Sequence, residues 1–365
     1  MSEYQFIQVN DKKQQKMFLD LPGRIYALGE NPQDYKTEKQ IIEWTHPLST
    51  NMKAYPFVVI DESKCAVCRC ILTYYPNDPV AYVGFFEAFN DREAVKFMFD
   101  NVEYKAFKDG KTTLLGPIDS SIYIRYRFRI NDFDETYTGE PYNKYYYSEL
   151  WEYAGFIVSD RYVSNKIRVP KDSDCDEKLK KIYNRFINRG YKFVDAKEED
   201  FYQYLDEMYS LIMKLYSGFS GYKPINEEQF IRLFGPLKNI INFDMVKFVY
   251  NKNDKLCAFC ISLPNYGKLT QGKITLSKIL KIKKIKKNPK EYVILYVGAD
   301  TDSIGLGGAL MQYVYNELVK NGCSSIGALI KEGNVTGKMY NKLYTGQFQY
   351  VLLKKEIKDN IYIEI

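Results

Sequence analysis

The sequence predicts an α/β (α+β) protein built of two similar domains in tandem, each a mixed twisted sheet flanked by helices. The chain has 365 residues, which is more than a single domain usually holds. Hydrophobic residues make up 45% of the chain and charged residues 27%, as in proteins with a well-filled core. A set of motifs also occurs twice in the same order, which indicates an internal repeat.

The repeat begins with a β-hairpin pattern in each half. Residues 57–72 read FVVIDESKCAVCRCIL and residues 248–263 read FVYNKNDKLCAFCISL. Each has an apolar run, a polar turn and a second apolar run that carries Cys-Ala-x-Cys. This cysteine spacing also suits zinc, but residues three apart in a strand face opposite sides of the sheet. We therefore expect core cysteines and no metal site.

Helical and strand patterns follow each hairpin in the same order. A helical pattern ends at Gly110 in the first half and at Gly322 in the second, where glycine suits a left-handed cap. Short strands are predicted next, over residues 112–118 and 324–330. We expect an N-terminal domain at residues 1–168, a linker segment at 169–190 with a helix from 177 to 188, and a C-terminal domain at 191–365.

The composition excludes several kinds of site. His46 is the one histidine of the chain, so a site with several histidine ligands is impossible and a hydrolase triad has a single candidate base. We expect His46 to serve a turn. The odd count of seven cysteines favours reduced thiols, and no apolar run is long enough to span a bilayer. With no secretory signal pattern at its start, the chain is expected in the cytoplasm without a membrane partner.

Residues 291–320 carry the strongest chemical signal. An apolar strand pattern at 293–297 leads through a loop into Gly305-Leu306-Gly307-Gly308 and then a helical pattern. A strand, a glycine turn and a helix together aim backbone N–H groups at a phosphate, and glycine leaves room for its approach. The segment matches neither the dinucleotide-binding nor the P-loop pattern, so glycines that serve only a tight turn remain the alternative.

This segment resembles the acyl-CoA-binding motif of the GNAT superfamily of N-acetyltransferases, Gln/Arg-x-x-Gly-x-Gly/Ala. The resemblance continues in that family's Asn-x-x-Ala, Leu-Tyr and Gly-Phe segment, matched here by Asn334, Gly337, Tyr340, Leu343, Gly346 and Phe348. By motif it covers residues 190–365, and the internal repeat extends it to the first half. It implies an N-acyltransferase that moves an acyl group from acetyl-CoA or another acyl-CoA to an amine of a small-molecule or amino-acid-like acceptor.

The resemblance also implies roles for residues of the second half. The donor would be bound by Tyr296, Val297, Asp302, Ser303, Ile304, Gly305, Leu306, Gly307, Gly308 and Asn334. Tyr340 is the expected acid for the departing thiolate, with Tyr344 second, and Glu332 or Asp300 is the expected base.

Two features depart from the family motif. Asp302 stands where the family has Gln or Arg, and residues 291–319 contain no Lys or Arg. A pyrophosphate would therefore meet Asp300 and Asp302, which Lys331 or Lys338 could offset. The first half has residues 88–93, AFNDRE, in place of the loop, so we do not expect it to bind a donor.

Two further segments allow more than one interpretation. The first combines polar and aromatic residues and is either a strand and turn at the domain contact or an acceptor pocket formed by Arg125, Arg127, Glu140, Tyr142 and Asn143. The second, residues 268–290, holds nine lysines and no acid. We expect an amphipathic insertion packed on the sheet; a nucleic-acid or membrane-surface patch is the alternative, and the lysines would suit a tRNA arm. Aminoacyl-tRNA-dependent transfer and a non-catalytic pseudo-acyltransferase therefore stay open.

Overall fold

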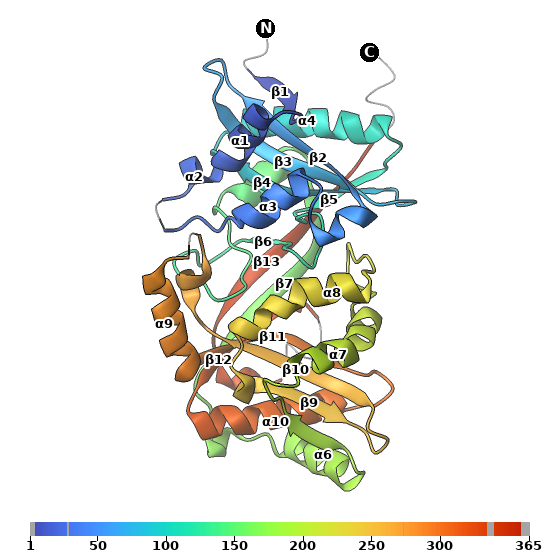
Figure 1. Ribbon diagram of the computed structural model, residues 1–365, viewed down its shortest axis with the longest axis vertical. Helices are drawn as coiled ribbons and strands as arrows, with labels where there is room; N and C mark the ends of the chain where they lie inside the picture. The colour runs from blue at the N-terminus through green and yellow to red at the C-terminus, as the bar shows by residue number, and fades with distance from the viewer. Residues whose placement is uncertain (1–3, 28, 273, 334–338, 359–365) are drawn as a thin grey trace.

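The computed structural model describes residues 4–27, 29–272, 274–333 and 339–358 (Figure 1). The first half contains β1 (Gln5–Gln8), α1 (Lys12–Asp20), α2 (Pro22–Ile25), α3 (Tyr35–Ile42), β2 (Lys53–Ile60), β3 (Ala66–Tyr74), β4 (Val80–Ala88), α4 (Arg92–Lys108), β5 (Thr113–Gly116), β6 (Phe128–Arg129), α5 (Tyr147–Tyr153) and β7 (Ile157–Ile167). The second half contains α6 (Glu177–Asn188), β8 (Lys192–Asp195), α7 (Phe201–Tyr216), α8 (Glu227–Phe234), β9 (Val246–Tyr250), β10 (Leu256–Pro264), α9 (Leu276–Lys287), β11 (Glu291–Ala299), α10 (Leu306–Asn321), β12 (Ser324–Lys331) and β13 (Tyr344–Glu356).

The repeat predicted from the sequence is visible in the strand order. Strands β1 to β5 of the first half have the same succession as β8 to β12 of the second. Both predicted hairpins form, β2 with β3 and β9 with β10, and both are antiparallel. In each half a helix then connects two parallel neighbours, β4 with β5 and β11 with β12. The predicted mixed sheet flanked by helices is confirmed.

The two halves share one sheet because they exchange their last strands. The order is β1-β2-β3-β4-β5-β13-β7-β12-β11-β10-β9-β8, so β13 lies beside β5 and β7 lies beside β12. Strands β7 and β13 pair with each other along the middle of the molecule (Figure 1). The two separate sheets that the repeat suggested are therefore joined into one, a pairing that no local pattern encodes.

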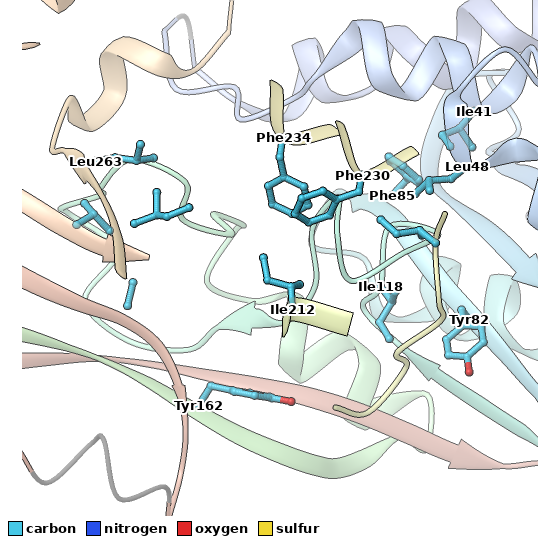
Figure 2. Packing of buried hydrophobic residues seen from close by; sticks show 14 of the residues in the cluster. Ile41, Leu48, Tyr82, Phe85, Ile118, Tyr162, Ile212, Phe230, Phe234 and Leu263 are labelled. Atoms are coloured by element: carbon cyan, nitrogen blue, oxygen red, sulfur yellow. The ribbon is translucent and has the colours of Figure 1, made fainter. Parts of the chain in front are cut away.

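Helices cover both faces of this sheet. On one face α4 and α5 pack over the first half, and α6 and α10 pack over the second. The other face carries a single apolar cluster that runs across both halves. Figure 2 shows Ile118 of the first half in this cluster with Ile212, Phe230 and Phe234 of α7 and α8. The contact between the halves is thus part of the core.

Local predictions are confirmed where short-range chemistry decides the backbone. Helix α6 spans 177–188 as expected, and its N-cap Asp176 accepts from the backbone N–H groups of Lys178 and Leu179. Gly322 ends α10 with a φ of 60°. His46 caps a short 3-10 helix, where its Nδ1 accepts from Leu48 N–H, and burial lowers its pKa. The turn role expected for His46 is confirmed.

Helix α9 differs from the expectation for the lysine-rich segment. The insertion is helical, but none of the residues of α9 is buried, and Leu276 and Leu280 are 81% and 69% exposed. The expected packing of its apolar residues on the sheet is therefore wrong for these two side chains. Among the described residues, no helix is both long enough and apolar enough to cross a membrane.

Candidate acyl-donor site

The site begins where two parallel strands separate. Strands β11 and β12 pair from Glu291 with Ser324 to Ile294 with Gly327 and no further. Both strands continue beyond this point, β11 to Ala299 and β12 to Lys331. Their facing edges at residues 295–299 and 328–331 are therefore open to a ligand that pairs with the backbone.

The open edge of β11 presents the backbone of Val297. Leu295 is an extra residue in β11, because Tyr296 pairs with Ile261 while Ile294 pairs with Ser262. Past this bulge, Asp300 N–H donates to Cys257 O of β10 at 2.7 Å. The alternation of an antiparallel ladder then directs Tyr296 N–H toward β10 and Val297 N–H toward the gap. Of the two predicted donor-binding amides on this strand, Val297 is the one that faces the opening.

The loop after β11 delivers the N-terminus of a 16-residue helix to the same place. Gly305 is the N-cap of α10, with a φ of 93° and no side chain to cap the helix. The first turn therefore keeps backbone N–H groups without an intrahelical acceptor, at the positive end of the helix dipole. A Cβ at Gly307 would lie 3.7 Å from the Cβ of Ala299, so this turn sits against the end of β11. The glycine turn and helix N-terminus that the sequence pattern predicts are therefore present, and this arrangement suits a phosphate.

The corresponding place in the first half is closed by the protein itself. Strand β4 pairs with β5 only as far as Tyr82, but Ile118 N–H then donates to Val83 O and Asp119 accepts from Phe85 N–H. At Gly84, a Cβ would collide with the Ile118 backbone. The expectation that the first half has no donor loop agrees with this closed edge.

The loop between β11 and α10, residues 300–305, is called the donor loop here. Its two acidic residues have a basic partner that the sequence did not reveal. Lys214 of α7 lies 2.8 Å from Asp300 Oδ1 and 3.2 Å from Asp302 Oδ2. The hydrogen bond from Lys214 holds the pKa of Asp300 below its ordinary value. Lys331, one of the two lysines expected to compensate, pairs with Asp160 instead. Lys338, the other, lies outside the described residues, as do Asn334 and Gly337.

A second cation reaches the loop from α6. Arg185 Nη2 lies 3.4 Å from Ile304 O, and a Cβ at Gly305 would lie 3.0 Å from the same nitrogen. Among the described residues, no carboxylate pairs with Arg185, so its charge is available to an anion at the helix terminus. Tyr191 bonds Ser303 Oγ at 3.2 Å and supports the loop from the same side.

A cavity of about 130 Å³ occupies the gap between β11 and β12. Its walls include both predicted acids, Tyr340 and Tyr344, together with Asn165, Tyr216 and Phe219. Glu332 is exposed and Asp300 is paired with Lys214, and neither lines this cavity. The two predicted acids are therefore brought to the gap, while the two predicted bases are not.

The two tyrosines differ in how their hydroxyls are held. Tyr340 O–H donates to Gln312 Oε1 of α10 at 2.8 Å, and its ring stacks on Tyr315 with centroids 4.7 Å apart. Tyr344 O–H donates to Met339 O at 3.0 Å. Burial raises the pKa of both hydroxyls, so both stay protonated at neutral pH. A protonated phenol is the form that a general acid needs.

A larger cavity of about 400 Å³ lies between the two halves and shares Tyr216, Phe219, Leu295 and Leu329 with the first. Of the predicted acceptor residues, Arg125 and Arg127 line it. The other three do not: Tyr142 and Asn143 line a small neighbouring cavity, and Glu140 is paired with Arg129.

The side chains of Glu140 and Asn143 are occupied by hydrogen bonds within the protein. Glu140 accepts from Arg129 at 2.8 Å and from Tyr350 O–H at 2.6 Å. Asn143 accepts from Arg129 N–H at 2.7 Å and donates to Arg129 O at 3.1 Å. These bonds anchor β6 beside β13. For these two residues the geometry favours the alternative of a strand and turn at the domain contact.

Sequence reasoning missed Lys214, Arg185, Tyr216 and Phe219. They come from α6, from α7 and from the segment directly after it, which lie about 80 residues or more before the donor loop in the chain. No spacing rule links them to Gly305, so only the packing of these segments around β11 brings them to the site.

Comparisons with known proteins were made at the level of sequence and of structure. No protein-family model matches the sequence, and a search of the curated proteins finds no match. A tandem GNAT protein from the clavulanic acid biosynthesis pathway superposes with a TM-score of 0.51 at 12% identity, over 98% of this chain and 99% of that one. At this identity the likeness shows the fold alone.

Two further solved structures have a similar fold. A GCN5-related N-acetyltransferase from Kribbella flavida has a TM-score of 0.50 at 8% identity, over 97% of this chain and 72% of that one. A conserved protein of unknown function from Enterococcus faecalis V583, described as a probable N-acyltransferase, has a TM-score of 0.50 at 10% identity, over 98% and 73%. This chain has the tandem GNAT fold that the motifs of the second half predict.

Proposed function

We propose that this tandem GNAT-fold protein is an N-acyltransferase that takes an acyl group from acyl-CoA, acetyl-CoA being the simplest donor, and transfers it to an amine. The observation that carries the proposal is that two groups meet at one opening: the backbone of Val297 on the open edge of β11, and the N-terminus of α10, which Gly305 leaves without a side-chain cap. A pantetheine arm needs the first and a pyrophosphate needs the second.

The residues of the gap supply the rest of the chemistry. Val297 N–H would donate a hydrogen bond to the oxygen of a carbonyl at the gap and stabilise the charge that develops on it. In the proposed reaction Tyr340 would give its proton to the departing thiolate, once its hydroxyl had turned away from Gln312. Among the described residues, neither cavity is lined by Asp or Glu, so the amine would lose its proton through water or tyrosine.

Titration calorimetry of the purified protein with acetyl-CoA tests the donor site. We expect micromolar binding that weakens as salt is raised, because the phosphates bring most of the charge. No detectable binding of acetyl-CoA or of longer acyl-CoAs would contradict the proposal and leave the non-catalytic alternative.

Gly307 is the better position for variants that test phosphate binding at the helix N-terminus. Gly305 has a positive φ, so any side chain there would strain the loop whether or not it binds phosphate. Gly307 has an ordinary φ and an open surrounding. Gly307→Glu should reduce acetyl-CoA affinity more than Gly307→Gln, because the two side chains match in size and differ in charge. Equal affinities would place the phosphates elsewhere.

A second function, aminoacyl-tRNA-dependent transfer, is favoured by α9. This exposed helix carries six lysines and no acid, which suits a phosphate backbone. Salt-sensitive binding of tRNA that is lost when Lys281, Lys283 and Lys284 are changed to Glu would support it. Acetyl-CoA binding without tRNA binding would remove it.

A further inference from the structure

We propose that Arg127 binds a carboxylate of the ligand that fills the 400 Å³ cavity between the halves, so that the acceptor is an amine with a carboxylate and an apolar or aromatic body. That this ligand is the acceptor rests on the proposed function, but the carboxylate site itself does not depend on acyl transfer. The site is inferred from the buried positive charge of Arg127.

Arg127 is a buried guanidinium for which the described part of the chain supplies no anionic partner. It is 5% exposed, and among the described residues no carboxylate lies within ion-pairing distance of it. Its Nη1 donates to Leu329 O at 3.1 Å, while its Nε is buried without any hydrogen-bond partner. The rings of Tyr126 and Tyr162 lie 3.6 and 4.0 Å from its Cζ. These rings stabilise the cation but do not neutralise it.

The two neighbouring arginines, Arg125 and Arg129, show what Arg127 lacks. Arg129 is fully buried and pairs with Glu140 at 2.8 Å, and Arg125 pairs with Asp119 at 2.6 Å. Burial lowers the pKa of Arg127 to about 10, which still leaves it charged at neutral pH. Burying a charge without a partner costs stability. A ligand carboxylate would compensate that cost.

The backbone around Arg127 is held in an unusual conformation. Arg127 has a φ of 83°, and Leu329, whose carbonyl it contacts, has a φ of 56°. Both values are uncommon for residues with a Cβ, and such positions gather at functional sites. Leu329 lies at the start of the open edge of β12 and lines both cavities. The hydrogen bond thus connects the first half to the open gap between β11 and β12.

The remaining walls of this cavity define the rest of the ligand. They are largely aromatic and aliphatic, including Tyr123, Tyr126, Phe234, Leu263 and Tyr296. Its charged lining residues among those described are Arg125, already paired, and Arg127. A cavity of this composition disfavours a polyamine, because none of its described lining residues is a carboxylate that could bind the positive charges. It suits an apolar body with one acidic end.

Matched probes test the carboxylate site without a known acceptor. Calorimetry would compare L-phenylalanine with L-phenylalaninamide and 2-phenylethylamine, and L-leucine with its amide and its decarboxylated amine. We expect the carboxylates to bind at least about tenfold more tightly than their amides, as for a charge-assisted bidentate pair. Arg127→Gln should remove this difference, whereas Arg125→Gln should keep most of it. Binding of the amides as tight as that of the acids, or no binding of any carboxylate, would overturn the proposal.

A second variant and a second ligand keep the outcomes separate. If Arg127→Gln does not fold, Arg127→Lys retains the charge without the planar fork and should weaken the preference for the acid only in part. The acetyl-CoA titration is run on the same proteins. Carboxylate preference without acetyl-CoA binding would contradict the proposed function and support this inference. Acetyl-CoA binding with no carboxylate preference would support the proposed function and overturn this inference.

Discussion

Among single residues, the N-cap position distinguishes the corresponding helices of the two halves. Helices α4 and α10 occupy the same place in the two repeats, but α4 is capped by Asp91, whose side chain accepts from Ala94 N–H at 3.0 Å. Helix α10 is capped by Gly305, which has no side chain to offer. A carboxylate at the first position satisfies the free N–H groups and repels an anion. Glycine at the second leaves these groups to a ligand.

A single substitution tests the proposed role of Tyr340 as the general acid. We expect Tyr340→Phe to lower kcat by about 10²-fold, as for loss of a general acid, and to change KM for the acyl donor little. Tyr344→Phe, on the same cavity wall, is the matched control and should have a smaller effect. Steady-state kinetics with acetyl-CoA and a responsive amine would measure both. An unchanged kcat in Tyr340→Phe would exclude it as the acid.

The pH profile gives a further check on Tyr340. Burial raises the pKa of this hydroxyl above the ordinary 10.0, so it stays protonated at and below that pH. An acid must be protonated to act, so no fall in kcat due to Tyr340 is expected as pH rises toward 10. A wild-type alkaline limb below pH 9 that disappears in Tyr340→Phe would contradict the assigned pKa shift.

At the scale of secondary structure elements, buried charge pairs hold helices to the sheet. Lys247 of β9 is fully buried and pairs with Asp195 of β8 at 2.6 Å and with Glu317 of α10 at 3.1 Å. The helix that carries the donor loop is thereby attached to the sheet near its C-terminal end. Burial raises the pKa of Glu317, but the hydrogen bond and charge of Lys247 outweigh this and hold the pKa below 4.5.

Removing the charge of Glu317 from its pair with Lys247 should cause a measurable loss of stability. Glu317→Gln should reduce the free energy of unfolding by about 2 kcal/mol at pH 7, because Lys247 keeps only one, more exposed, anionic partner. Because the folded pKa of Glu317 is lowered, its stabilisation is present above pH 4.5 and is lost as pH falls through the folded pKa. Urea denaturation at pH 7 and pH 4 should therefore show a larger difference from wild type at pH 7.

The matched control is Asp195→Asn in the same network. The Asp195 side chain is 55% exposed and that of Glu317 is 11% exposed. Water can replace a more exposed partner, so Asp195→Asn should cost less than Glu317→Gln. Equal costs in the two variants would show that exposure does not govern this network.

At the scale of the whole molecule, the exchange of β7 and β13 makes the two halves one structural unit. The strand that completes the first half's sheet comes from the end of the second half, and the reverse holds for β7. Both cavities of the candidate site lie near this exchange: Asn165 and Ile167 of β7 line the smaller one, and the larger one takes its walls from both halves.

The exchange predicts how the separated halves behave. Residues 1–168 alone would lack β13, and residues 191–365 alone would lack β7, so each would expose an unpaired central strand. We expect neither to show a cooperative thermal transition by circular dichroism, while the intact chain unfolds in one transition. The two parts of a chain divided at residue 174 and produced together should associate and recover the intact melting curve. An isolated half that melts cooperatively near the temperature of the intact chain would contradict this.

Local sequence patterns predict the repeat, the hairpins, the extent of α6 and the glycine loop before α10. Each follows from short-range physics: the period of apolar residues, side chains that cap helix ends, and the freedom of glycine at positive φ. The motif resemblance added the fold, which the solved structures confirm.

Tertiary packing determines the strand exchange, the position of Lys214 and Arg185 beside the loop before α10, and, within the described part of the chain, the lack of an anionic partner for Arg127. Each depends on which distant segments pack together. Such contacts are chosen by the burial of whole faces and by strand pairing across more than 80 residues, and these leave no local pattern in the chain.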